Sequence, residues 1–206
     1  MKNVLITGFE PFGGDTLNPS AQAARELDGR IVAGQRVTGI VLPCVFGESL
    51  VALRREIRRL KPGLVICAGQ AGGRGDIGVE CLAVNIANAA MPDNAGHQPV
   101  NCRVVRRGPA AYWSTLPVEA IVAALQAADL PASVSHSAGT FVCNHVFYGL
   151  MRMLAQMRAV RGGFIHVPYL PAQARRIAGG TPSLSLARIV RGLEMASEIS
   201  VAINKV

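Results

Sequence analysis

Cys143 is the residue whose type and position most clearly suggest a chemical role, and it lies in the run SAGTFVCNHVFYGLM from Ser137 to Met151. A glycine, a short β-prone segment and a cysteine before an amphipathic pattern predict a strand-to-helix turn, with the cysteine near the helix N-terminus. Unpaired backbone N–H groups and the helix dipole favour a thiolate there. Because the thiolate is the nucleophilic form, Cys143 is a candidate for covalent catalysis. The competing interpretation is a small buried apolar residue.

A cysteine nucleophile needs a base, and the chain has four histidines. His145 follows Cys143 by two residues, so on a helix it would point to roughly the opposite side. His97 lies in the polar segment MPDNAGHQP, and His136 precedes the turn. His166, in GGFIHVPYLP, ends an apolar strand and is the preferred base. Its alternative role is that of a hydrogen-bonded core histidine.

Glu80 is the candidate third group, because it closes a glycine-rich loop and precedes an apolar segment. A carboxylate that accepts the ring N–H of a histidine fixes its tautomer and stabilises the imidazolium. An exposed loop carboxylate is the alternative. Glu80, Cys143 and His166 would come from three separate strand ends.

Residues 73–78, GRGDIG, match the G-x-G-x-x-G dinucleotide fingerprint and follow the apolar run GLVICA. The fingerprint requires a helix after its glycines, whereas residues 79–86 look extended. We therefore interpret residues 73–78 as a loop that crosses the site and ends at Glu80. No cofactor is predicted, and no cluster of metal ligands is evident, so no metal is predicted either.

Predicted strands and helices alternate along the chain, and they must position Glu80, Cys143 and His166. Strands are expected at 2–9, 36–42, 63–68, 79–86, 132–135 and 164–167, and helices at 21–27 (capped by Ser20), 48–60, 112–125 (starting near Pro117), 144–157 and 182–203. This alternation predicts a single α/β domain over residues 1–206, a three-layer α/β/α fold with a mainly parallel twisted central sheet and helices on both faces. Active sites of such sheets form beyond the carboxyl ends of the strands.

The composition bears on membrane association and cellular location. Half of the 206 residues are hydrophobic, and no apolar run is long enough to span a bilayer, so no membrane partner is expected. The apolar segment near the N-terminus is too short for a signal peptide. The five cysteines are odd in number and form no C-x-x-C pair. Reduced thiols and a cytoplasmic location are therefore expected.

The net charge of +8 raises the possibility of nucleic-acid binding. The densest basic cluster lies in the predicted helix 48–60 and just after it, opposite an apolar stripe: Arg54, Arg55, Arg58, Arg59 and Lys61. No aromatic residues lie among these cations, so base stacking has no platform. We expect a solvated helix face and no nucleic-acid partner.

Six motifs together resemble the pyroglutamyl peptidase I family, which are cysteine peptidases. They occur in one consistent order along the whole chain: GFEPFGG (8–14), the loop through Glu80, MPDN (91–94), YWSTLP (112–117), SAGTFVCNH (137–145) and FIHVPYLP (164–171). The resemblance implies a triad of Glu80, Cys143 and His166 that removes an N-terminal 5-oxoproline (pyroglutamyl) residue from peptides through a thioester. It also implies a homo-oligomer, with a tetramer as the expected form.

The resemblance further implies a pocket for the lactam ring. Phe9 and Phe12 would pack on the ring, and Gln70 and Asn18 could hydrogen-bond its edge. Further residues are implied near the ring: Cys44, Met91, Phe141 and Val142. In the alternative interpretation, Asn18 shapes a turn and the two phenylalanines belong to the core.

The chain departs from the family pattern at two positions. Ala90 stands where an arginine thought to help position the catalytic or oxyanion region is usual, and Cys81 stands where a basic residue is common. Loss of a charge near an oxyanion can lower rates by orders of magnitude. One alternative is therefore a catalytically weak homologue that binds pyroglutamyl termini without efficient turnover. A thiol amidohydrolase acting on a free small amide is another.

Overall fold

The computed structural model describes residues 3–157, 159–177 and 179–203. Its centre is a seven-stranded sheet in the order β2-β3-β1-β4-β9-β5-β8. The strands are β1 (Val4–Phe9), β2 (Ile31–Val32), β3 (Gln35–Leu42), β4 (Leu64–Gln70), β5 (Ile77–Glu80), β8 (Ala132–Ser135) and β9 (Arg161–Val167). A second, two-stranded sheet pairs β6 (Leu82–Val84) with β7 (Ala111–Trp113).

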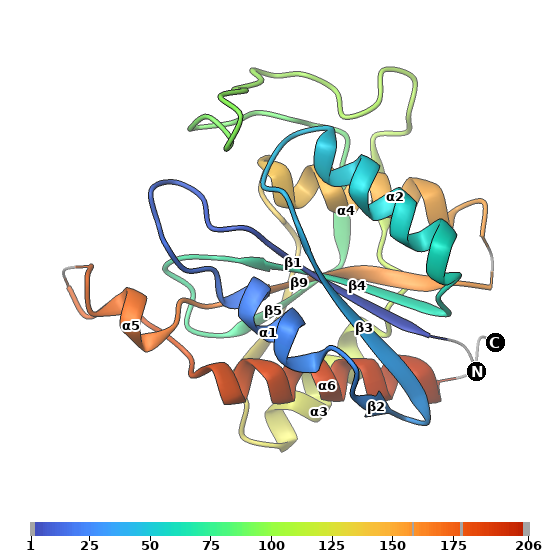
Figure 1. Ribbon diagram of the computed structural model, residues 1–206, viewed down its shortest axis with the longest axis vertical. Helices are drawn as coiled ribbons and strands as arrows, with labels where there is room; N and C mark the ends of the chain where they lie inside the picture. The colour runs from blue at the N-terminus through green and yellow to red at the C-terminus, as the bar shows by residue number, and fades with distance from the viewer. Residues whose placement is uncertain (1–2, 158, 178, 204–206) are drawn as a thin grey trace.

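Helices cover both faces of the large sheet (Figure 1). On one face lie α1 (Pro19–Leu27), α3 (Val118–Ala127) and α6 (Leu186–Ala202), and α6 contacts both of the others. On the other lie α2 (Glu48–Leu60) and α4 (Val142–Leu154). The short α5 (Pro171–Ala174) follows β9. The predicted three-layer α/β/α architecture is confirmed.

The sheet is mainly parallel, as predicted, but it is mixed at one side. Strands β3, β1, β4 and β9 run parallel, whereas β5 pairs with β9 antiparallel and β8 runs parallel to β5. The carboxyl ends of β5 and β8 therefore point to the opposite edge from those of β1, β4 and β9. The carboxyl ends of the strands therefore do not all meet at one edge of the sheet, so a site that includes β5 or β8 does not follow the rule for purely parallel sheets.

Two apolar cores lie on the two faces of the sheet. Successive strand residues alternate between them, since side chains in a strand point to opposite faces. Ile66 and Ile165 belong to the core under α1, α3 and α6, whereas Val65 and Phe164 belong to the core under α2 and α4. The continuous apolar runs of the sequence thus reflect strands covered on both sides.

Helix α1 lies unusually close to the sheet at Gly39 of β3. A Cβ atom at Gly39 would overlap the backbone carbonyl of Ala24. Only glycine allows this approach, which brings the backbone of α1 directly against β3.

Several element boundaries differ from the prediction. The expected strand 79–86 is two strands, β5 and β6, in different sheets. Tyr112 lies in β7 and not in a helix, while α3 starts immediately after Pro117, as expected. Helix α1 is capped by Asn18 and not by Ser20, because the Asn18 side chain accepts a hydrogen bond from the Ser20 N–H. The last helix starts at Leu186, after a Ser185 cap.

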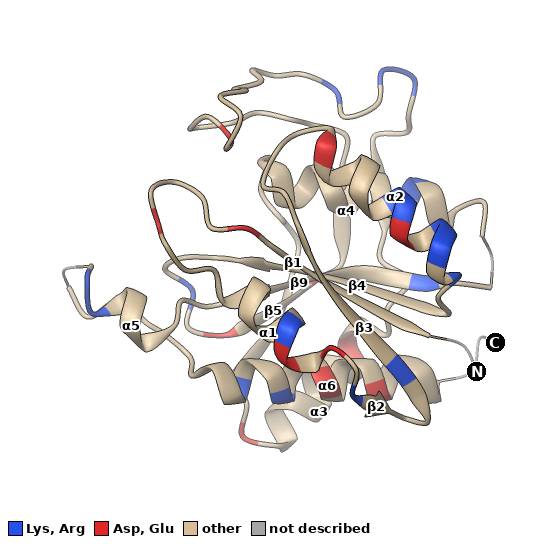
Figure 2. Ribbon diagram, in the orientation of Figure 1, with Lys and Arg blue, Asp and Glu red and all other residues tan. Residues whose placement is uncertain are grey.

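The basic cluster of α2 forms a solvated outer face, as predicted (Figure 2). Its arginines are exposed, while Leu53 and Ile57 are buried beneath them. Glu56 forms ion pairs with Arg55 and Arg59, so part of the positive charge is compensated.

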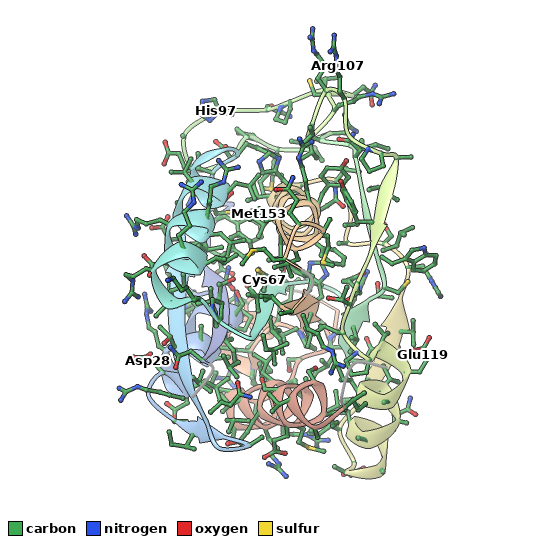
Figure 3. The ribbon with its side chains drawn as sticks, turned by 90° about the vertical axis from the view of Figure 1, so that its right-hand side faces the viewer. Asp28, Cys67, His97, Arg107, Glu119 and Met153 are labelled. Carbon is green, nitrogen blue, oxygen red and sulfur yellow. The ribbon has the colours of Figure 1, made fainter. Side chains whose placement is uncertain are left out.

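A long excursion, residues 85–110, connects β6 to β7 on the α2 and α4 side. His97 and Arg107 lie at its outer end, whereas Cys67 lies deep between α4 and the sheet (Figure 3). The excursion is fastened to the body by Asn144, whose Nδ2 donates to the carbonyls of Val84 and Ile86 at 2.9 Å. Among the described helices, none has the length and apolar character needed to cross a membrane.

The α6 face of the core offers a test of the fold. Leu193 is fully buried against the sheet. We expect Leu193→Ala to lower the free energy of unfolding by about 2–5 kcal/mol, because it removes buried methyl groups and leaves a cavity. Val51→Ala, at an exposed position of α2, should change it by less than about 0.5 kcal/mol. Urea denaturation followed by circular dichroism measures both, and equal effects would contradict the packing described.

Candidate active site

Strands β5 and β9 bring a carboxylate and an imidazole together. Their antiparallel register places Gly78 opposite His166 and Glu80 opposite Phe164. Glu80 therefore reaches diagonally to the ring, and its Oε1 lies 2.7 Å from His166 Nδ1. Both side chains are buried, with exposed fractions of 0% for Glu80 and 5% for His166. The pair is fixed by the sheet itself.

The surroundings of Glu80 keep it ionised. Burial is the largest single influence on this carboxyl and raises its pKa, whereas the hydrogen bond and charge of His166 lower it. Ser135 and Arg74 act in the same direction, so the pKa lies below its ordinary value of 4.5. An ionised Glu80 accepts the Nδ1–H of His166, which leaves Nε2 of the neutral ring as a proton acceptor.

Cys143 is the second residue of α4, after the N-cap Phe141 and Val142. Its sulfur lies against Gly69 of β4: a Cβ atom on Gly69 would be 2.8 Å from Cys143 Sγ. Gly69 is the register partner of His166 in the neighbouring strand β9. The absence of a side chain at position 69 therefore gives the thiol its place beside the strand pair that carries the imidazole.

The pKa of the Cys143 thiol is shifted in the direction opposite to that expected from the sequence. Burial raises the pKa of the Cys143 thiol well above its ordinary value, and Cys44, Glu80 and Cys67 add to the effect. Cys143 is half-buried, and this partial burial shifts the pKa in the direction opposite to the effect expected of the helix N-terminus. A neutral thiol needs a base to become a nucleophile.

The other three histidines are occupied elsewhere. His145 packs edge-on against Phe46, and its Nε2 accepts the backbone N–H of Gly47. Burial lowers the pKa of His145 to about 4. His97 lies by Asp93, with Nδ1 3.3 Å from Oδ2, and His136 Nδ1 lies 3.0 Å from the Cys81 sulfur.

Three of the residues expected to contact substrate, Phe12, Gln70 and Met91, line a cavity of about 520 Å³. Its remaining lining residues are Gly13, Gly14, Asp15, Gly72, Tyr169, Gln173, Arg176 and Ile177. Phe141 joins this group from α4, since its ring centroid is 5.8 Å from that of Phe12. The cavity thus has aromatic and thioether walls with amide groups beside them.

The other expected pocket residues lie deeper. Phe9 is 1% exposed and packs on Phe164, at 6.3 Å between ring centroids. Val142 is also fully buried, and burial, with Asp93 and Glu10, raises the pKa of the Cys44 thiol to about 12.

Asn18 has the contacts of a helix cap. Its Oδ1 accepts from the N–H and hydroxyl of Ser20, and its Nδ2 donates to the Glu10 carbonyl. These bonds match the turn-shaping interpretation of Asn18.

Sequence reasoning missed Gln173, which organises the polar side of the cavity. Its Nε2 donates to Gln70 Oε1 at 2.9 Å and to Asp15 Oδ2 at 2.5 Å. Because the Gln70 oxygen is occupied, the Gln70 amide offers its N–H groups to a ligand. A glutamine two residues after the FIHVPYLP motif was the available signal, but only the tertiary fold brings it to Gln70.

The fingerprint-like run 73–78 leads into β5 and not into a helix, so it lacks the N-terminus that would hold a pyrophosphate. Ala90, at the position of the usual family arginine, is exposed. Among the described residues no group of three or more histidine, cysteine, aspartate or glutamate side chains could hold a metal ion.

The neutral resting thiol can be tested by alkylation. Since burial raises the Cys143 pKa above 9.0, its reaction with iodoacetamide should keep accelerating as the pH rises past 9.0. Peptide mapping by mass spectrometry separates Cys143 from the exposed Cys102. A rate that levels off below pH 7 would show instead that the thiolate is already formed in the resting protein.

Comparisons with known proteins all indicate the same family. A family model described as pyroglutamyl peptidase matches residues 2–204. The pyrrolidone-carboxylate peptidase of Klebsiella pneumoniae (strain 342) is 54% identical over 205 residues, covering 100% of this chain and 94% of that protein. The pyrrolidone-carboxylate peptidase of Bacillus cereus (strain Q1) is 50% identical over 205 residues, covering 99% and 95%.

Solved structures give the same result. Pyroglutamyl peptidase I from Bacillus amyloliquefaciens has a TM-score of 0.95 at 45% identity and covers 98% of both chains. Pyrrolidone carboxyl peptidase from Thermococcus litoralis has a TM-score of 0.94 at 40% identity, covering 98% of this chain and 94% of that one. The chain therefore belongs to the pyroglutamyl peptidase family.

Proposed function

We propose that this chain is a cysteine exopeptidase that removes an N-terminal pyroglutamyl residue from peptides. The observation that carries the proposal is the Glu80–His166 hydrogen bond of 2.7 Å beside the Cys143 thiol, in a chain 54% identical to a pyrrolidone-carboxylate peptidase. The comparisons give no support to the alternative of a homologue that binds without turnover.

In the first step, His166 takes the proton of the neutral Cys143 thiol through Nε2. The sulfur attacks the carbonyl carbon of the pyroglutamyl residue, and the carbonyl oxygen becomes an oxyanion. Backbone N–H groups at the start of α4 are suited to receive that oxyanion, because they have no partner within the helix. Glu80 holds the imidazolium that forms, as an oriented counter-charge.

In the second step, the imidazolium gives its proton to the leaving amine, and a thioester joins Cys143 to the pyroglutamyl group. Water, deprotonated by the same ring, then attacks the thioester. Pyroglutamate leaves, and the proton returns to the Cys143 sulfur. Each proton thus passes through His166, which explains why both of its ring nitrogens need fixed roles.

The cavity suits a lactam in size and chemistry. The ring of pyroglutamate is a flat apolar body with one N–H and one C=O at its edge. Phe12, Phe141 and Met91 supply apolar contact, and the free N–H groups of Gln70 match the lactam carbonyl. Substrate has no charged N-terminal amine, so no acidic pocket is required.

The activity itself is the main test. The purified, reduced protein should release aminomethylcoumarin from its pyroglutamyl derivative and not from the alanyl or prolyl derivatives. Cys143→Ala should lower kcat/KM by at least about 10⁴-fold, since the nucleophile is lost. Glu80→Gln should lower it by about 10²- to 10⁴-fold, because the neutral amide no longer stabilises the imidazolium.

Thermal melting of each variant serves as the control for folding. Failure of the freshly reduced wild-type protein to turn over any pyroglutamyl substrate would overturn the proposal. Hydrolysis of free glutamine or simple cyclic amides in preference to pyroglutamyl peptides would point to a different thiol amidohydrolase.

We further propose that the chain is one catalytic domain, cytoplasmic and assembled as a homo-oligomer. The family model spans nearly all of the sequence, and the five cysteines are free thiols. A free nucleophilic thiol functions in reducing surroundings, which supports a cytoplasmic location. Light scattering coupled to size-exclusion chromatography tests the assembly: a tetramer is expected, and a monomer at assay concentration would contradict it.

A further inference from the structure

Arg74, in the fingerprint-like loop, contacts the candidate acid and its surroundings with both terminal nitrogens of its guanidinium group. Its Nη1 donates to Glu80 Oε1 at 3.2 Å and to Ser135 Oγ at 3.1 Å, and its Nη2 donates to the Ser137 carbonyl at 3.2 Å. One side chain thereby joins the end of β5, the end of β8 and the loop that leads into α4. None of these contacts follows from sequence spacing.

Space for this guanidinium comes from Gly78, in the same run. A Cβ atom at Gly78 would lie 2.8 Å from Arg74 Nη1. Gly78 is the residue directly opposite His166 in the β5–β9 register. The run that resembles a dinucleotide fingerprint therefore supplies both a cation for the site and the gap that the cation occupies.

Glu80 needs a permanent cation. A fully buried carboxylate without compensation is strongly disfavoured. The titratable or charged groups around Glu80 are His166 from β9, Arg74 from the loop, Cys143 from α4 and Cys81, the next residue in the chain. Burial raises the pKa of both thiols, so they stay neutral.

The charge of His166 changes during the reaction, whereas that of Arg74 does not. To accept the thiol proton the ring has to be neutral, and a neutral ring contributes a hydrogen bond without a positive charge. An arginine remains protonated at every accessible pH. Within the described part of the chain, Arg74 is thus the cation bound to Glu80 at the moment when the base must act.

A neutral Glu80 would disable the base. A protonated carboxyl donates its hydrogen to Nδ1, which would leave the ring proton on Nε2, facing the thiol. That tautomer cannot accept the thiol proton. We infer that Arg74 is a positioning residue, which keeps Glu80 ionised and thereby holds His166 in the tautomer with a free Nε2.

This inference rests on the proposed peptidase function, so wild-type turnover of pyroglutamyl-aminomethylcoumarin is measured first. Arg74→Gln should lower kcat by about 10- to 100-fold, the loss expected when a reacting group is slightly misplaced. KM should stay within about twofold, because Arg74 does not line the substrate cavity. The kcat of Arg74→Lys should lie between those of the wild type and Arg74→Gln, since lysine keeps the charge but lacks the two-nitrogen fork.

Chemical rescue separates an electrostatic role from a structural one. Added guanidinium ion at millimolar concentration should raise kcat of Arg74→Ala, and the same concentration of sodium chloride should not. Arg107→Ala is the matched control, because Arg107 is exposed at the outer end of the 85–110 excursion (Figure 3). It should keep wild-type kcat and show no response to guanidinium.

Gly78→Ala tests the same contact without removing the arginine. The added methyl group would displace the guanidinium, so kcat should fall in the same direction as in Arg74→Gln. The double variant should be no slower than Arg74→Gln alone, because both changes break one interaction. This variant also decides the matter if Arg74→Gln or Arg74→Ala does not fold.

The outcomes are distinct. An inactive wild-type protein would overturn the proposed function. An active wild type with unchanged kcat in Arg74→Gln or Gly78→Ala would overturn this inference alone. A loss that guanidinium does not restore and that follows a drop in melting temperature would also overturn it, because Arg74 would then only stabilise the fold.

Discussion

The hydrogen bond between Glu80 and His166 is the interaction on which the site depends. A carboxylate with no exposure to solvent is strongly disfavoured unless its charge is compensated, and at Glu80 both His166 and Arg74 bond to the same oxygen, Oε1. The antiparallel entry of β5 beside β9 creates this match, since it sets Glu80 one diagonal step from the ring. A parallel β5 would reverse the strand and change that step. The mixed sheet therefore holds the two side chains in contact.

The nucleophile depends on the same strands through backbone geometry. Gly69 lacks a side chain at the point where the Cys143 sulfur lies, and its register partner is His166. The helix that carries the cysteine also seals the second core, through Phe147 and Leu150. Packing of α4 thus fixes the height of the thiol above the sheet. The partial burial of Cys143 raises the pKa of its thiol, so under the proposed function the nucleophile requires His166 as a base.

The cavity is assembled by loops from distant parts of the chain. The loop after β1 carries Phe12 and Asp15, and residues after β9 carry Gln173, which holds Gln70 in one orientation. The excursion from residue 85 to 110 brings Met91 to the same cavity. Hydrogen bonds of this kind determine how a ligand can be oriented in an apolar pocket, because they decide which amide atoms remain free.

The layered α/β architecture could be predicted from the sequence, which also indicated Cys143, His166 and Glu80 as candidate reactive groups. Continuous apolar runs such as VLITGF and LVICA require strands covered on both sides, and the cysteine before an amphipathic run marks the start of α4. The tertiary structure decided the reversed direction of β5, the capping by Asn18, the deep burial of Phe9 and the partners of Arg74 and Gln173. These depend on strand pairing and on contacts between residues far apart in the chain, for example 103 positions for Gln173 and Gln70. Local periodicity carries no record of such pairings, because it reports which face of an element is buried and not what lies against that face.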